Sequence, residues 1–196
     1  MLVTREMANI NSKEDKPCTI EELMAIITAP TGGFVMLPNT DCDEVFPGII
    51  LGDGTVAKSP GTLKKHGITH IVNTALGKTK YHVNSNHVMY RKYDIIFKGI
   101  EATDHMSFDL TPFFDSCAEF IHEALKNNGK VYVHCVQGVS RSATITIAYL
   151  MIKQHMTVRD ALRLVRSKRE VCPNDGFLEQ LCKLNTKLTM NGHFKK

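Results

Sequence analysis

The sequence predicts an α/β fold: a single domain whose central, mostly parallel, twisted sheet of about five strands carries helices on both faces. Short runs rich in Val, Ile and Tyr alternate along the chain with longer segments of helical periodicity. This alternation is typical of parallel sheets that are covered on both sides. The length of 196 residues and the hydrophobic content of 43% suit the core of one ordinary domain.

The first half of the chain is expected to form a helix, a hairpin arm and two further strands. A capping box, Thr19 with Glu22, predicts a helix over TIEELMAII. An early strand or hairpin arm, interrupted by Pro47, is expected in EVFPGIILGD. A short helix closed by Gly67 fits SPGTLKKHG, and the β-branched run behind it predicts a strand in ITHIVNTA. A further strand is expected in MYRKYDIIF.

The second half alternates helices with one buried strand. Thr111 and Pro112 are typical of a helix start, and this helix is expected to end near Asn127. The Val and Tyr residues of KVYVHC predict a short buried strand, and a long apolar helix follows from Arg141 to about Gln154. Thr157 is expected to cap the next helix. The last one, over GFLEQLCKLNTKL, starts at Asn174 or Asp175.

Composition excludes several classes of protein. No run of about 18 apolar residues occurs and the N-terminus soon becomes charged, so we expect no membrane span or signal peptide and place the protein in the cytoplasm or nucleus. The six cysteines lack disulfide-framework spacing, which favours reduced thiols. A net charge of +4 is too weak to imply nucleic acid but is compatible with an anionic ligand. Residues 1–17 and 190–196 are expected to be flexible tails around a domain at 18–189.

The segment HCVQGVSRS joins the buried strand to the apolar helix and has the composition of an anion site. Backbone N–H groups converge at a helix N-terminus, and Gly138 lets the backbone approach a ligand closely. Ser140 and Ser142 supply hydroxyl groups, and Arg141 supplies a planar fork for two phosphate oxygens. The sequence therefore predicts a phosphate-binding loop between strand and helix.

Cys135 adds chemistry to this loop. The helix N-terminus and Arg141 are features that lower a thiol pKa, and a thiolate below a bound phosphate is placed for in-line attack on phosphorus. The alternative for the pair is a buried core cysteine and a surface arginine.

This segment resembles the His-Cys-x5-Arg-Ser signature of the cysteine-dependent protein tyrosine phosphatases, and the rest resembles the small, atypical dual-specificity phosphatases of the VHR type. The likeness is carried by GITHIVNTA, HVNSN, IAYLMI and REVCPNDGFLEQLCKLN. It covers about residues 18 to 189, with no kinase-docking domain expected before them. It implies that the domain at 18–189 is a dual-specificity phosphatase catalytic domain.

The resemblance implies roles for the loop residues. Cys135 is the nucleophile, Arg141 clamps the phosphoryl oxygens, and Ser142 stabilises the departing thiolate, although a serine at a helix start can also be a simple cap. His134 is expected to support the loop, or to be an ordinary core histidine. The implied phosphate-binding residues are Val136, Gln137, Gly138, Val139, Ser140 and Arg141.

A general acid is also needed, because the thiolate and the arginine cannot protonate the leaving oxygen. The resemblance places an Asp on a loop about thirty residues before the cysteine, which points to Asp104. Asp94, inside an expected strand, and Asp109, beside a helix cap, are the competitors.

The resemblance further implies phosphorylated proteins as substrates, with mitogen-activated protein kinases as the class, and a monomer or weak dimer. Arg169 matches a position associated with a second phosphate of the substrate; the alternative is an ordinary solvated face. Val136, Gln137 and Val139 replace larger or charged residues, which puts the rim contacts in doubt and argues against a phosphoinositide phosphatase. No metal or cofactor is expected, since the nine histidines show no ligand spacing. The competing hypotheses are a phosphoprotein-binding module without turnover and a phosphatase for a non-protein substrate.

Overall fold

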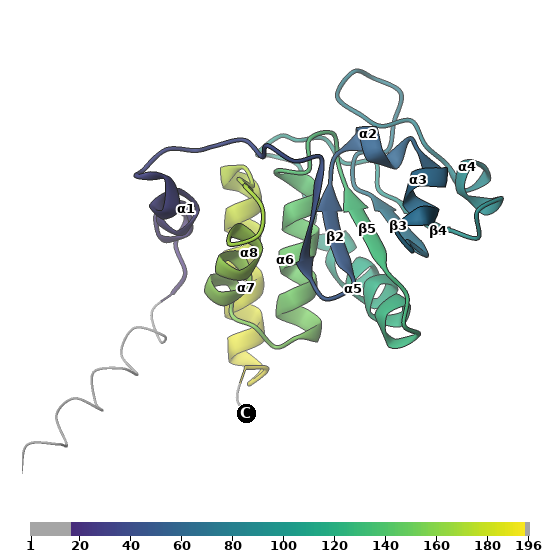
Figure 1. Cartoon of the computed structure of the whole chain (residues 1–196). Coiled ribbons are helices and arrows are strands. Elements are labelled where there is room, and N and C mark those ends of the chain that lie inside the picture. The colour runs from purple at the N-terminus through teal and green to yellow at the C-terminus, as the bar shows by residue number, and fades with distance from the viewer. Residues whose placement is uncertain (1–16, 195–196) are drawn as a thin grey trace, which may run out of the picture.

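A computed structural model describes residues 17–194 as a three-layer arrangement with a sheet between two groups of helices (Figure 1). The sheet has five strands in the order β1-β2-β5-β3-β4. The strands are β1 (Cys42–Phe46), β2 (Ile49–Gly52), β3 (His70–Asn73), β4 (Ile96–Gly99) and β5 (Val131–His134). β1 and β2 form an antiparallel hairpin, whereas the pairs β2/β5, β3/β5 and β3/β4 are parallel. The predicted α/β fold with a mostly parallel sheet of five strands is confirmed.

Alternating side chains divide the core between the two faces of the sheet. Val72 and Val133 point into a large cluster with α1 (Ile20–Thr28), α5 (Thr111–Lys126), α6 (Arg141–Lys153), α7 (Val158–Arg166) and α8 (Asp175–Met190). Ile71 and Tyr132 point into a smaller cluster with α2 (Gly54–Ala57), α3 (Pro60–Lys65) and α4 (His87–Arg91). β5 is the middle strand of the sheet. Because its side chains alternate with a period of two, they are buried on both faces. None of the helices within residues 17–194 is long and apolar enough to cross a lipid bilayer.

Several helix starts follow the local signals in the sequence. The side chains of Thr19, Thr157 and Asn174 accept hydrogen bonds from the N–H groups of Glu22, Asp160 and Phe177, and so cap α1, α7 and α8. In the hairpin, Gly48 adopts a positive φ of 79° directly after Pro47. These features depend on neighbours within a few residues, which explains why they could be predicted.

Of the strand expected in MYRKYDIIF, only Ile96 and Phe97 lie in a strand, and the prediction is wrong for residues 89–95. Asn86 accepts hydrogen bonds from Val88 N–H and Met89 N–H and so caps the short helix α4, and the strand β4 begins only at Ile96. Asp94 lies in the turn between them with a φ of 56°, not inside a strand. The short helix α2, capped by Asp53, was not anticipated.

The two ends of the described chain also differ from expectation. Cys18 and Cys182 form a disulfide across 164 positions, because α1 packs beside α8, so the prediction of six reduced thiols is wrong for this pair. The helix α8 runs to Met190. His193, which lies in the stretch 190–196 expected to be a flexible tail, stacks its ring on that of His155. The expected N-terminal tail, apart from residue 17, lies outside the described residues.

Candidate active site

The loop from Cys135 to Ser140 leaves the carboxyl end of β5, the central strand, and enters the N-terminus of α6. The neighbouring strands β2 and β3 end beside it, in register with His134. Ligands of open parallel sheets bind at this edge, since the loops after adjacent strands meet there. The cavity at the loop has a volume of about 220 Å³ and is lined by Asp104, Cys135, Val136, Gln137, Val139, Ser140, Arg141, Cys172 and Asn174.

Four consecutive carbonyl groups of this loop accept hydrogen bonds from outside the loop. Gly54 N–H donates to Val136 O at 3.0 Å, and Cys172 N–H donates to Val139 O at 2.9 Å. Between them, Arg169 donates from Nη2 to Gln137 O at 3.1 Å and from Nε to Gly138 O at 2.9 Å. Because these peptide oxygens bond outward, the N–H groups of the same loop can point inward, toward the Cys135 sulfur and an anion bound above it.

Gly138 is required by this backbone path. Its φ is +69°, and an added Cβ would lie 2.4 Å from Gly52 O, inside van der Waals contact with β2. Its N–H donates to the Cys135 sulfur at 3.2 Å. The loop therefore packs directly on the end of the neighbouring strand, where only glycine fits.

The Cys135 thiol lies at the base of the loop and is 2% exposed. Burial by itself raises the pKa of this thiol, but the Ser142 hydroxyl and N–H, the Arg141 charge and the Val139 N–H outweigh burial, so the pKa of Cys135 lies below its ordinary value. The Ser142 hydroxyl donates to the sulfur at 3.3 Å. A thiolate held in this way is a prepared nucleophile.

Arg141 is anchored on one side and open on the other. Its Nη1 donates to Ala102 O at 2.9 Å and to Tyr81 O at 3.1 Å. Its Nε lies 3.3 Å from Asp104 Oδ2, but the N–H is not aligned for a hydrogen bond within the described residues. The edge formed by Nε and Nη2 makes no hydrogen bond among the described residues, and once it leaves Asp104 it can grip two phosphate oxygens at once.

Asp104 is the one of the three candidate acids that contacts the loop. Its Oδ1 accepts hydrogen bonds from Ser140 Oγ at 2.8 Å and from Asn174 Nδ2 at 2.9 Å. Asp94 instead pairs with Lys64 on α3, and Asp109 accepts from the Thr111 N–H and hydroxyl at the start of α5. The structure thus leaves Oδ2 of Asp104 as the oxygen facing Arg141.

The two serine hydroxyls of the segment have partners within the protein. Ser140, expected to bind phosphate, donates to Asp104 and does not point into the anion cradle. Ser142 donates to the Cys135 sulfur, which is the contact that its expected role on the thiolate requires. His134 is fully buried, and its Nδ1 bonds Cys135 O at 2.9 Å. Burial lowers the pKa of His134 to about 4, so the ring is neutral and supports the loop.

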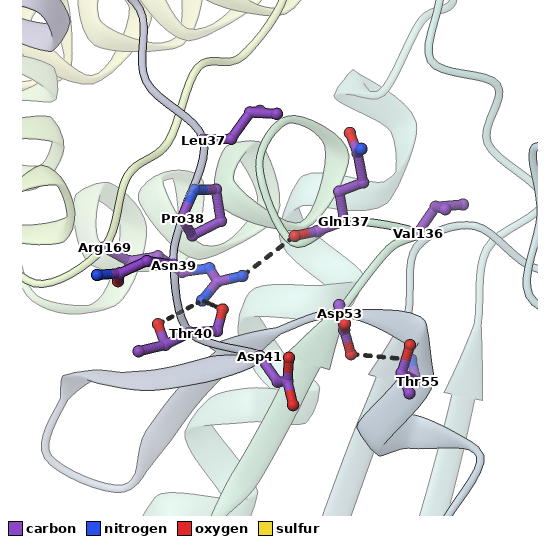
Figure 2. Close-up of a pocket in the computed structure, with 10 residues that line it drawn as sticks. All are labelled: Leu37, Pro38, Asn39, Thr40, Asp41, Asp53, Thr55, Val136, Gln137 and Arg169. Atoms are coloured by element: carbon purple, nitrogen blue, oxygen red, sulfur yellow. Dashed lines mark hydrogen bonds between the residues drawn. The ribbon is translucent and has the colours of Figure 1, made fainter.

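Arg169 was expected at an exposed rim, and the structure places it elsewhere. Its side chain is 3% exposed. Its contacts with Gln137 O and with Thr40 O, the latter at 3.0 Å, are drawn in Figure 2. It also pairs with Asp43 at 2.8 Å. Its donors are therefore used within the protein, which argues against a second-phosphate receptor.

Asn174 is a site residue that sequence reasoning missed. It was expected only as a helix cap, and its Oδ1 does accept from Phe177 N–H at 3.1 Å. The cap turns the other end of the amide, Nδ2, toward Asp104. An aspartate could cap α8 equally well but could not donate this bond, so the choice of Asn over Asp at this cap is the signal that was available.

The chain is similar in sequence to known phosphatases. Residues 49–187 match the family described as "Dual specificity phosphatase, catalytic domain". The mouse protein named dual specificity protein phosphatase 13B is 45% identical over 150 residues, covering 76% of this chain and 75% of the mouse protein. The human protein of that name is 44% identical over 147 residues, covering 74% and 73%.

Several solved structures share the fold of this chain. The human tyrosine phosphatase-like serine/threonine/tyrosine-interacting protein is 31% identical, with a TM-score of 0.65 over 76% of this chain and 97% of that one. DUSP15 is 29% identical, with a TM-score of 0.60 over 76% and 95%. Human DUSP28, at 24% identity and a TM-score of 0.67 over 79% and 99%, shares the fold.

Proposed function

Because the chain belongs to the dual specificity phosphatase family, we propose that it hydrolyses phosphotyrosine and phosphoserine or phosphothreonine in proteins through a phosphocysteine intermediate. The observation that carries this proposal is the loop in which four consecutive carbonyls bond outward around a thiol of lowered pKa. A binding site for phosphate alone would need the N–H groups but no nucleophile below them.

In the first step, the Cys135 thiolate attacks phosphorus, the S–P bond forms and the bond to the leaving oxygen breaks. The Nε and Nη2 edge of Arg141 and the loop N–H groups bind the oxygens of the transferred group. Asp104 donates its proton to the leaving oxygen, which departs as the free hydroxyl of the protein residue. When Arg141 turns to the phosphoryl group, Oδ2 of Asp104 loses its ionic neighbour, while Ser140 and Asn174 keep Oδ1 in place.

In the second step, water attacks the phosphocysteine and the S–P bond breaks. The Asp104 carboxylate takes a proton from that water, and inorganic phosphate leaves. The sulfur departs as a thiolate, and the Ser142 hydroxyl and the Gly138 N–H, which already bond it in the free protein, stabilise its charge.

Mitogen-activated protein kinases are the substrate class that the family likeness suggests, and they are part of the proposal. Two other functions remain as outcomes to test. One is binding without turnover; the 31% identical human neighbour is named phosphatase-like and interacting. The other is action on a non-protein phosphate ester. The expected cytoplasmic or nuclear location and the monomer or weak dimer also stay predictions.

The test is phosphate release by the full chain, with EDTA present, from phosphotyrosine and phosphothreonine peptides, phosphoinositide vesicles and RNA 5′ ends. We expect turnover of the peptides and none by Cys135→Ser. With an aryl phosphate whose acidic leaving group needs no proton, Asp104→Asn lacks only the base of the second step, so a quench during turnover should trap one phosphoryl group on Cys135. Turnover that requires a metal, or that survives Cys135→Ser, would contradict the mechanism. Binding of phosphopeptides by the wild type without any release would favour the binding module.

A further inference from the structure

A second pocket, with a volume of about 360 Å³, lies beside the catalytic cavity. The segment 32–41 between η2 (Ala29–Thr31) and β1, which we call the strap, forms one wall through its residues 37–41 (Figure 2). Val136 and Gln137 of the catalytic loop line both hollows. A polypeptide whose phosphorylated residue enters the catalytic cavity therefore brings neighbouring residues within reach of this strap pocket.

The strap pocket has an apolar part and an acidic part. Leu37, Pro38 and Val136 form the apolar part, and Leu37 is 62% exposed although it is a large hydrophobic residue. Asp41 and Asp53 form the acidic part, at the ends of the two strands of the hairpin.

The two aspartates are opposite each other in the register of the hairpin. Cys42 pairs with Gly52, and the next step of this register places Asp41 opposite Asp53, with the Asp53 N–H donating to Asp41 O at 2.9 Å. Like charges directly opposite on an antiparallel pair are destabilising. Among residues 17–194, no Lys or Arg forms an ion pair with either carboxylate.

The one cation in the lining, Arg169, does not remove this negative charge. It pairs with a third carboxylate, that of Asp43, and its guanidinium donates hydrogen bonds to backbone oxygens of the strap and the catalytic loop. The Asp41 and Asp53 carboxylates therefore line the pocket without an ion-pair partner among the described residues, while Asp43 pairs with Arg169. A second phosphate dianion brought to this pocket would meet net repulsion, whereas a cation would relieve it.

We propose that the strap pocket binds a lysine or arginine side chain of the substrate, close in sequence to the phosphorylated residue. This inference rests on the proposed function, since it names a feature of the protein substrate of the same site. The side chains match the pocket in both parts: the alkyl stem lies against Leu37, Pro38 and Val136, and the charged head reaches Asp41 and Asp53. Specificity for basic flanking residues follows from this arrangement.

The experiment compares kcat/KM for phosphotyrosine peptides in which each position from −3 to +3 is Lys, Ala or phosphothreonine. For wild type, we expect a Lys to Ala ratio of about three- to tenfold at one or two positions, because both carboxylates are partly solvated. The ratio should shrink as salt rises from about 0.05 to 0.5 M, because the Debye length shortens. At the same position, the kcat/KM of the phosphothreonine peptide should be lower than that of the Ala peptide.

The variants are Asp41→Asn, Asp53→Asn and the double change. Asparagine keeps the oxygen with which Asp53 accepts the N–H groups of Thr55 and Val56 at the start of α2, so the cap survives while the charge is lost. The Lys to Ala ratio should fall below about twofold in the double variant. Glu123→Gln, the same loss of charge near the C-terminal end of α5, is the matched control and should leave the ratio unchanged.

A second readout needs no substrate. Relief of the repulsion in Asp41→Asn should raise Tm by up to about 2 °C. A flat Lys scan on peptides that wild type does hydrolyse, an unchanged ratio in the double variant, or a preference for phosphothreonine over Lys would each overturn the inference and leave the proposed function standing. Failure to hydrolyse any phosphopeptide would overturn both.

Discussion

Asn174 Nδ2 donates a hydrogen bond of 2.9 Å to Asp104 Oδ1, joining two residues 70 positions apart. The same amide caps α8 through its oxygen, so the fold fixes its orientation before any substrate binds. One side chain thus links the helix start to the candidate acid.

The link predicts a pair of variants with different effects. Asn174→Asp keeps the cap but places a carboxylate against Asp104 in place of a donor, whereas Asn174→Ala loses both contacts. In Asn174→Asp we expect kcat for phosphotyrosine peptides to fall about tenfold or more, with little loss of stability. An aryl phosphate with a very acidic leaving group should suffer much less, because it needs no proton. Equal losses on both substrates would mean that Asn174 serves the fold only.

The Cys135 environment predicts how the thiol reacts with pH. Because the pKa of Cys135 lies below its ordinary value, the thiolate persists as pH falls toward that lowered pKa, and inactivation by iodoacetamide should have its midpoint below the ordinary value of about 8.5. Ser142→Ala removes a hydrogen bond to the sulfur, so its midpoint should move to higher pH.

Alkylation of the other thiols is controlled with Cys135→Ser. Burial raises the pKa of Cys172, which lines the same cavity, so its reaction should be confined to higher pH. A midpoint in the wild type that matches the one in Cys135→Ser would contradict the prepared thiolate.

Arg169 predicts a uniform loss in place of a change in specificity. Arg169→Ala removes the donors to Gln137 O and Gly138 O and leaves the Asp43 carboxylate without its ionic partner, so we expect a loss of about 1.5–3 kcal/mol in stability. Because the loop carbonyls lose their outward donors, kcat/KM should fall by a similar factor for singly and doubly phosphorylated peptides. A fall confined to doubly phosphorylated peptides would restore the second-phosphate role.

His134 predicts a dependence of stability on pH. The unfolded imidazole has a pKa near 6.5 and the buried one a pKa of about 4, so the unfolded chain binds the extra proton between these values. Stability is therefore complete above about pH 6.5 and is lost as pH falls toward 4, by roughly 3 kcal/mol for this group.

Urea unfolding at pH 7 and pH 5 measures this loss of stability. His134→Asn keeps a donor for Cys135 O but cannot take up the proton, so its stability should fall less than that of the wild type between the two pH values. The same loss in both proteins would assign the pH dependence to other groups.

Local chemistry in the sequence was sufficient for much of this fold. The caps of α1, α7 and α8, the turn at Pro47 and Gly48 and the buried strand β5 depend on residues a few positions apart. The strand prediction was wrong for the first residues of MYRKYDIIF because the Asn86 cap and the packing of Tyr90 against the small core favour a helix there.

By itself the sequence determined the α/β class and the loop from Cys135 to Ser142, because a strand end, a glycine and a helix start suffice to build an anion cradle. Only the tertiary structure decided which groups complete it. Arg169 lies behind the loop, Asn174 reaches Asp104, and Cys18 meets Cys182, all through contacts between residues that are 31 to 164 positions apart. A long polar side chain can reach many partners, and the one it bonds depends on where the packed helices bring its neighbours.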